Sequence, residues 1–235
     1  MTTFDGTVEL GALNHDGVPL PRPTRPWIVD LSVLQPYPGL EPGNIAEFEA
    51  TPDWSRWALA DTPADPAFRL RWIALRTEKL RLLICDRVIL VRVSWQDLDE
   101  AGLVSGVPVV LDGGTYTCRL LSGGCNFRTG EDGHSGGAPN DNEWDRFVVA
   151  EEAVAGLPLP SNSDLAEPLG EAQRLGSHNG FWNWVGAHSW TATPFARRAS
   201  ARCCRGYAAA NFFYLNTVDH RHEDIGWRPV LECPL

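Results

Sequence analysis

Apolar and polar residues alternate over short stretches of this chain, which is the pattern of a half-buried β-strand. The clearest stretch is 68–73, where apolar and basic positions take turns. A shorter strand is predicted for 27–31, inside a proline-rich and less regular region from 17 to 66. The 18 prolines and 22 glycines occur along the whole length, which suits short strands joined by many turns.

Two hairpins are predicted from pairs of neighbouring apolar runs. One would join 80–85 to 88–93 through a polar two-residue turn. The other joins 107–111 to 115–121 and is favoured more strongly by its turn sequence. Its Asp112-Gly113 turn is of the kind that twisted antiparallel strands prefer.

Helical spacing occurs in two places. Ser94 is positioned to cap a short helix over 95–101 that Gly102 ends. A second helix is predicted where Asn140, with Glu143 three residues later, resembles a capping box. The apolar stripe of this second helix consists of Trp144, Phe147, Val148 and Val154.

The composition fits one folded domain over 1–235, in which 1–66 is an irregular N-terminal portion. Hydrophobic residues make up 43% of the chain and include ten tryptophans, enough for a sizeable core. A net charge of −10 argues against binding to nucleic acid or anionic lipid, which need a basic face. No apolar run approaches the roughly 20 residues of a transmembrane helix, and the N-terminus lacks a secretory pattern. We therefore expect a soluble chain made in the cytoplasm, without membrane insertion.

Six short motifs follow one another between residues 93 and 231. They are Val93-Ser94-Trp95-Gln96-Asp97, Arg119-Leu120-Leu121-Ser122, 142–147, 181–184 together with 189–191, Arg205-Gly206-Tyr207, and 225–230. In this order they resemble the formylglycine-generating (sulfatase-modifying factor) branch of the C-type-lectin-like fold. The resemblance implies an α+β fold over 88–235, with short strands, long loops and two short helices. It also implies that 181–184 and 189–191 form paired strands, whereas 123–139 is an insertion of about seventeen residues.

In this class of fold the last loop commonly lines the ligand surface, and here it corresponds to 208–224. Its aromatic groups offer large rigid contact area, and its amide, imidazole and carboxylate groups offer adaptable hydrogen bonds. The loop is also similar in position and composition to the one that variable proteins of diversity-generating retroelements diversify. The candidate ligand-binding residues are Asn211, Phe212, Phe213, Tyr214, Asn216, Asp219, His220, Arg221 and His222. Since adjacent residues of an extended chain point opposite ways, Phe212 and Phe213 are not both expected to be buried.

The enzymes of this branch hold copper through two cysteines just after the arginine–glycine turn. The corresponding stretch here, 208–213, contains no cysteine, and Cys203-Cys204 precede the turn instead. A copper(I) site would therefore lack its soft thiolate ligands. The cysteines are expected to be buried thiols, because no pair has the spacing of a zinc site, and the adjacent Cys203-Cys204 pair is the exception to this expectation.

Two other metal sites are alternatives. His220 and His222 lie on one side of an extended chain, and His178 or His188 would supply a third imidazole for iron. The insertion 123–139 carries the carboxylate and amide oxygens that calcium prefers, although without an ordered ligand pattern.

The sequence thus favours a non-catalytic protein that recognises a protein or glycan ligand through 211–222, without a required cofactor. It would act as a homo-oligomer or as part of a phage-like particle such as a phage tail. The first alternative is a metal-dependent oxidase or oxygenase of the formylglycine-generating branch. The second is a structural subunit of such a particle, docked through its proline-rich N-terminal region.

Overall fold

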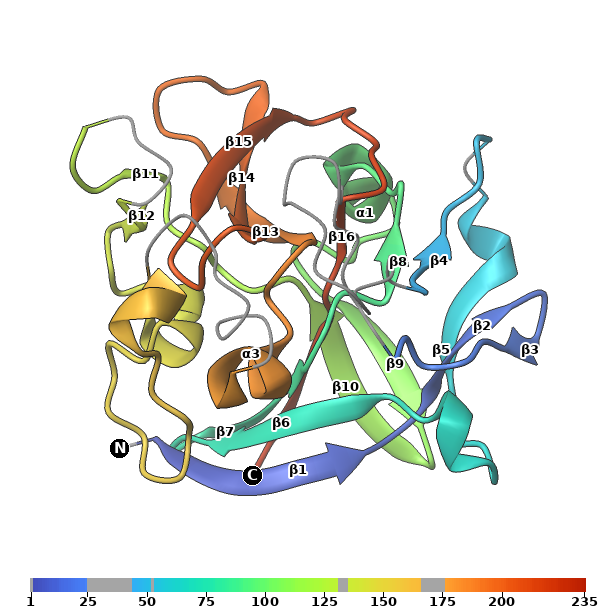
Figure 1. The fold of residues 1–235 in the computed structure, drawn as a ribbon. Helices are drawn as coiled ribbons and strands as arrows, with labels where there is room; N and C mark the ends of the chain where they lie inside the picture. The colour runs from blue at the N-terminus through green and yellow to red at the C-terminus, as the bar shows by residue number, and fades with distance from the viewer. Residues whose placement is uncertain (1, 25–43, 52, 131–134, 166–175) are drawn as a thin grey trace, which may run out of the picture.

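The computed structural model describes residues 2–24, 44–51, 53–130, 135–165 and 176–235 (Figure 1). The fold is mixed and dominated by strands, with few short helices, several antiparallel sheets and a half-barrel. The strand predicted for 27–31 lies outside the described residues. No helix among the described residues is long and apolar enough to cross a membrane.

The first sheet joins strands from the two ends of the chain. Its order is β1 (Thr3–Glu9), β6 (Arg71–Arg76), β7 (Leu80–Cys85), β17 (Val230–Pro234), β10 (Gly114–Arg119) and β9 (Val107–Leu111), all antiparallel. Three strands from the first ninety residues therefore pair into the sheet that contains the last strand. Figure 1 shows both ends of the chain at this sheet.

The second sheet contains the segment that was predicted to bind ligand. Its order is β15 (Phe213–Thr217), β14 (Ala201–Gly206), β13 (His188–Pro194), β16 (Ile225–Trp227), β8 (Leu90–Val91) and β4 (Ala46–Glu47). The β13–β16 and β4–β8 pairs are parallel. The two small sheets are β3 (Val18–Pro19), β2 (Ala12–His15) and β5 (Trp57–Ala60), and β11 (Asn126–Phe127) with β12 (Gly137–Ala138).

The hairpin predicted around Asp112-Gly113 is confirmed. Strands β9 and β10 pair from Leu111 and Gly114 outward, with only the two turn residues between them. Asp112 has φ of 51° and Gly113 has φ of 77°, the left-handed conformation that a type I′ turn requires at both positions.

The hairpin predicted from 80–85 and 88–93 is wrong. Strand β7 pairs with β6 and β17, whereas β8 pairs with β16 and β4, so the chain passes from one sheet to the other. The residue at the crossing, Asp86, is fully buried and forms ion pairs with Arg71 (2.5 Å) and Arg87 (2.6 Å). A buried and paired carboxylate fixes this crossing in place of an exposed turn.

Strand β6 differs from the prediction in position and in burial. It begins at Arg71, because Pro66–Phe68 form a short 3-10 turn (η2). Trp72 and Ala74 pack into one core cluster, and Ile73 and Leu75 pack into another. Both faces of the strand are therefore covered, and the expected half-buried alternation is absent.

The first predicted helix is confirmed as α1 (Trp95–Glu100). The Ser94 hydroxyl accepts from the backbone N–H of Asp97 at 3.1 Å, and the Asp97 carboxylate accepts from the Ser94 N–H at 2.7 Å. These two bonds form a capping box at the start of the helix. Gly102, with φ of 74°, follows its end as predicted.

The second predicted helix is only one π-helical turn, η3 (Trp144–Val148). The Asn142 side chain, not that of Asn140, accepts a hydrogen bond from the N–H of Asp145 at 3.0 Å. Glu143 instead pairs with Arg119 from the end of β10. The predicted apolar stripe of Trp144, Phe147, Val148 and Val154 is buried as expected.

A helix that the sequence did not predict, α3 (Ser177–Trp182), replaces the strand expected at 181–184. It ends at Asn183, whose φ of 45° is the left-handed conformation common at helix ends. The partner stretch 189–191 does lie in a strand, β13. The remaining 3-10 turns are η1 (Trp54–Arg56) and η4 (Asn162–Leu165).

The motif residues are buried in two neighbouring core clusters, and Leu120 belongs to the larger one. Leu121, Trp144, Trp182, Trp184 and Val230 belong to one buried cluster. Trp227 lies in the larger neighbouring cluster instead. Burial of each such aromatic side chain stabilises the fold by about 2–3 kcal/mol.

Candidate ligand-binding site

The segment 208–224, predicted as an exposed loop, contains an edge strand and a returning turn. Strand β15 pairs with β14 in the register Cys204 to Tyr214, and 218–224 then lead back to β16. Pairing imposes the two-residue alternation of a strand on the side chains. Phe213 is fully buried, whereas Tyr214 is 48% exposed and Phe212 is partly buried.

Phe213 belongs to the core and is therefore removed from the predicted binding residues. Its ring lies 4.9 Å from that of Phe127 in β11, centroid to centroid, and it clusters with Phe195 and Cys203. The insertion that carries Phe127 thus covers this face of β15. The opposite face carries Phe212 and Tyr214.

Arg221 also has a structural contact that the sequence did not reveal. Its guanidinium makes two hydrogen bonds, at 2.6 and 2.9 Å, to the carboxylate of Asp97, which belongs to the capping box of α1. The backbone of the turn is fixed to the same region by a hydrogen bond from the Gln96 N–H to the Val218 carbonyl at 2.9 Å. Arg221 therefore anchors the turn.

A pocket of about 230 Å³ lies between β15 and this turn. We call it the histidine cup, and its lining residues are His188, Tyr214, Asn216, His220, His222 and Asp224. Four of them are among the predicted binding residues. His188 was predicted only as a third metal ligand, and Asp224 only as the last residue of the loop.

The remaining predicted residues lie outside the lining of the cup. Asn211 is partly buried in the turn between β14 and β15, where its carbonyl accepts from Arg205 at 3.2 Å. Asp219 is exposed in the turn after β15, and a hydrogen bond with the Thr217 side chain lowers the pKa of its carboxyl group.

Aromatic rings stack around His188. Its ring centroid lies 4.6 Å from that of Tyr207, with 12° between the planes, and 5.7 Å from that of Tyr214. The residue opposite His188 in the sheet is Gly206, which has no side chain. The imidazole also lies near Phe212, in the turn between β14 and β15, at 5.8 Å between ring centroids.

His188 itself is 6% exposed, and its Nδ1 has no hydrogen-bond partner in the described part of the chain. Burial lowers the pKa of its imidazole to about 4, because the charged form is poorly solvated there. The ring is thus neutral at neutral pH. On the other wall of the cup, His222 Nδ1 lies 2.8 Å from Asp224 Oδ1.

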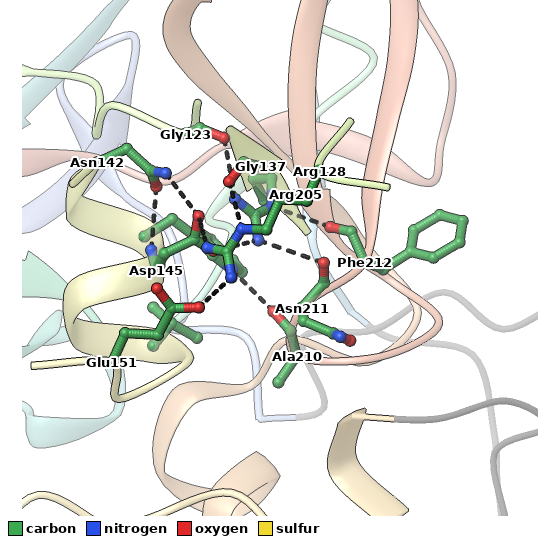
Figure 2. A network of polar contacts seen from close by, with 12 residues as sticks. Gly123, Arg128, Gly137, Asn142, Asp145, Glu151, Arg205, Ala210, Asn211 and Phe212 are labelled. Carbon is green, nitrogen blue, oxygen red and sulfur yellow. Dashed lines mark hydrogen bonds and ion pairs between the residues drawn. The ribbon is translucent and has the colours of Figure 1, made fainter. Parts of the chain in front are cut away.

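The hairpin is held from behind by the buried ion pair of Arg205 and Asp145 (Figure 2). Their nitrogen–oxygen distance is 2.6 Å, and both side chains are fully buried. Arg205 also donates to the carbonyls of Phe212 at 3.0 Å and Gly123 at 2.9 Å. One guanidinium therefore connects β14, the β14–β15 turn, the insertion and η3.

Further contacts extend this network on both sides. Arg128 of the insertion forms an ion pair with Asp145 at 2.6 Å and another with Glu151. The indole N–H of Trp144 donates to the Ala210 carbonyl in the β14–β15 turn at 2.8 Å. The turn is consequently fixed at three successive residues, because the Asn211 and Phe212 carbonyls also bind Arg205.

The vicinal cysteines do not form a reactive pair. Cys203 and Cys204 are both fully buried and pack into different core clusters, as neighbours on a strand do. Burial raises the pKa of Cys203 to about 12 and raises that of Cys204 as well. Both therefore remain protonated thiols at neutral pH.

Within the described ranges, no three His, Cys, Asp or Glu side chains are grouped closely enough to hold a metal ion. This applies to the histidines of the cup. The acidic residues of the insertion considered for calcium, at 131 and 132, lie outside the described residues.

Comparison of the chain with protein-family models, with curated proteins and with solved structures gives no significant match.

Proposed function

We propose that this chain is a non-catalytic recognition protein, and that the histidine cup is its ligand-binding site. The observation that carries the proposal is a pocket lined by aromatic and polar side chains on a hairpin that a buried ion pair fixes from behind. A preformed site of this kind loses little conformational entropy on binding, which favours affinity.

The proposal includes a C-type-lectin-like fold of the formylglycine-generating branch. The support is the ordered set of motifs, together with where these motifs lie. Val93-Ser94-Trp95-Gln96-Asp97 opens α1, Arg205-Gly206-Tyr207 ends β14, and 225–230 form β16 and the start of β17. The segment expected to line the ligand surface supplies five of the six residues of the cup.

The test is to compare three purified proteins on arrays of immobilised glycans and of folded proteins. These are the wild type, Tyr214→Ala in the cup, and Val110→Ala as a matched control. Val110 is an apolar residue 61% exposed on β9, in the other six-stranded sheet. An exposed aromatic anchor contributes about 1–3 kcal/mol to binding, so Tyr214→Ala should bind roughly tenfold more weakly.

The expected result is a reproducible set of array positions that wild type and Val110→Ala bind equally and that Tyr214→Ala binds more weakly. Equal binding by all three proteins would place the ligand surface elsewhere. Absence of binding on both arrays would contradict a recognition role for this chain.

A further inference from the structure

The histidine cup presents several hydrogen-bond acceptors. The Asn216 side chain donates one amide N–H to the sulfur of Cys204 at 3.6 Å, and its Oδ1 is an acceptor. Asp224 contacts His222 through Oδ1, which leaves the acceptor Oδ2. The buried Nδ1 of His188 has no partner among the described residues, and it is an acceptor when the imidazole proton is on Nε2. A ligand rich in donors would complement these groups.

The charge of the cup is negative when its histidines are counted as neutral. Among the described residues that line the cup, Asp224 is the one carboxylate and none is a lysine or arginine. Nearby, Arg221 pairs with Asp97, and Arg92 pairs with Glu47 and Glu223. Arg202, the strand partner of Asn216, stacks on Trp95 and donates to the Ala199 carbonyl at 2.6 Å. A cationic group would therefore enter without meeting a fixed positive charge on the lining.

The aromatic rings at the cup are nearly parallel to one another. The Tyr214 ring is nearly parallel to that of Phe212, with 11° between their planes, and to that of His188, with 20° between planes. Guanidinium is a planar cation that stacks on aromatic faces and carries five N–H donors in a fixed geometry. Ammonium lacks this shape and is more strongly hydrated.

The size of the cup suits a single side chain. Its volume of about 230 Å³ lies below the roughly 300–1,000 Å³ typical of pockets for drug-sized molecules. Arginine is also among the residues that most often dominate the binding energy of protein interfaces.

We infer that the histidine cup receives the guanidinium group of an arginine side chain from a protein partner. The guanidinium stacks on Tyr214, pairs with Asp224 and donates to Asn216. His188 forms the neutral floor. This inference rests on the proposed function of the cup as a ligand-binding site and names the chemistry of its ligand.

The probe is methylguanidinium chloride, which is titrated into the full chain. Backbone amide and imidazole resonances are followed by NMR. n-Butylammonium, acetate and methyl α-glucoside are titrated in parallel at matched ionic strength. The variants are Asp224→Asn, which removes the charge but keeps the shape, and Asp219→Asn, which removes an exposed carboxylate outside the cup. Thermal unfolding of both variants establishes that they are folded.

Methylguanidinium is expected to shift the resonances of His188 and Tyr214 saturably and to bind more tightly than n-butylammonium. Its dissociation constant should rise about fivefold or more in Asp224→Asn and stay within about twofold in Asp219→Asn. Absence of saturable shifts, or equal binding by Asp224→Asn, would overturn the inference. If methyl α-glucoside or acetate binds the cup instead, the guanidinium inference is wrong, while the proposed function of the cup stands. The array comparison of Tyr214→Ala tests that function separately.

Discussion

Three consecutive aromatic residues show how neighbouring positions are divided between the core and the other face of the sheet. Phe212 and Tyr214 share one face of the sheet with His188, whereas Phe213 is buried against Phe127 on the other face. The two-residue alternation of strands predicts such a division, but not which residues face the core. The sequence alone does not show which face of the strand the insertion covers.

The first prediction contrasts two of these residues. Phe213→Ala should lower the free energy of unfolding by about 3–5 kcal/mol, because it leaves a cavity in a closed cluster. Tyr214→Ala should lower it by less than about 1 kcal/mol, because the side chain is half exposed. Urea unfolding of both variants measures the difference. Similar losses in the two variants would mean that Tyr214 is a core residue rather than part of a binding surface.

A second prediction at this scale concerns pH. The pKa of His188 is about 4 in the folded protein and near 6.5 when unfolded, so the unfolded chain binds the extra proton between these values. His188 therefore contributes stability that is fully present above pH 6.5 and is lost as the pH falls toward 4, by about 3 kcal/mol in total. His188→Phe keeps an aromatic ring and removes the titration.

Chemical unfolding of wild type and His188→Phe at several pH values between 4 and 7 checks this effect. The wild-type free energy should fall more steeply with decreasing pH than that of the variant. Parallel curves for the two proteins would show that His188 titrates normally and is open to water.

Among the elements, the β14–β15 hairpin depends on the Arg205–Asp145 ion pair behind it. Asp145→Leu leaves the fully buried guanidinium of Arg205 without its carboxylate and should cost about 3–5 kcal/mol. Arg205→Met should cost less, because Asp145 keeps its ion pair with Arg128. The double variant should cost clearly less than the sum of the two single variants, because no unpaired charge remains. Urea unfolding of the four proteins completes this cycle. Strict additivity would mean that the two groups do not interact.

Elements determined by neighbouring residues could be predicted from the sequence. The Asp112-Gly113 turn and the Ser94 cap act within a few residues, and both are confirmed. The pairing of β7 with β17 could not be predicted, because its partners lie about 150 residues apart and the local pattern suggested a nearer hairpin. The 181–184 stretch likewise forms a helix end, since Asn183 adopts the left-handed conformation there.

The candidate site follows the same division. Tyr214, Asn216, His220 and His222 were predicted from the composition of one segment, and all four line the cup. His188 was missed as a cup residue because it reaches the cup through the parallel pairing of β13 with β16, which no local pattern encodes. The anchoring contact of Arg221 with Asp97 spans more than a hundred residues and was equally invisible.

Across the whole molecule, the two large sheets draw on different parts of the chain. The first sheet joins strands from both ends of the chain, and β15 is an edge strand of the second sheet (Figure 1). The cup is lined in part by side chains of β15. The net charge of −10 gives the molecule a field that attracts cationic partners at low ionic strength. A negative net charge favours the approach of a positively charged ligand, such as the guanidinium inferred for the cup.

The central claim is that recognition is concentrated in the histidine cup. Its most direct test is an alanine scan, measured on any array position that the wild type binds. One set of variants replaces Tyr214, Asn216, His220, His222 and Asp224, and the control set replaces the exposed apolar residues Val18, Val110 and Leu159. We predict losses of about 1–3 kcal/mol for several cup variants and less than about 0.5 kcal/mol for every control. Losses confined to the controls, or spread equally over both sets, would contradict the claim.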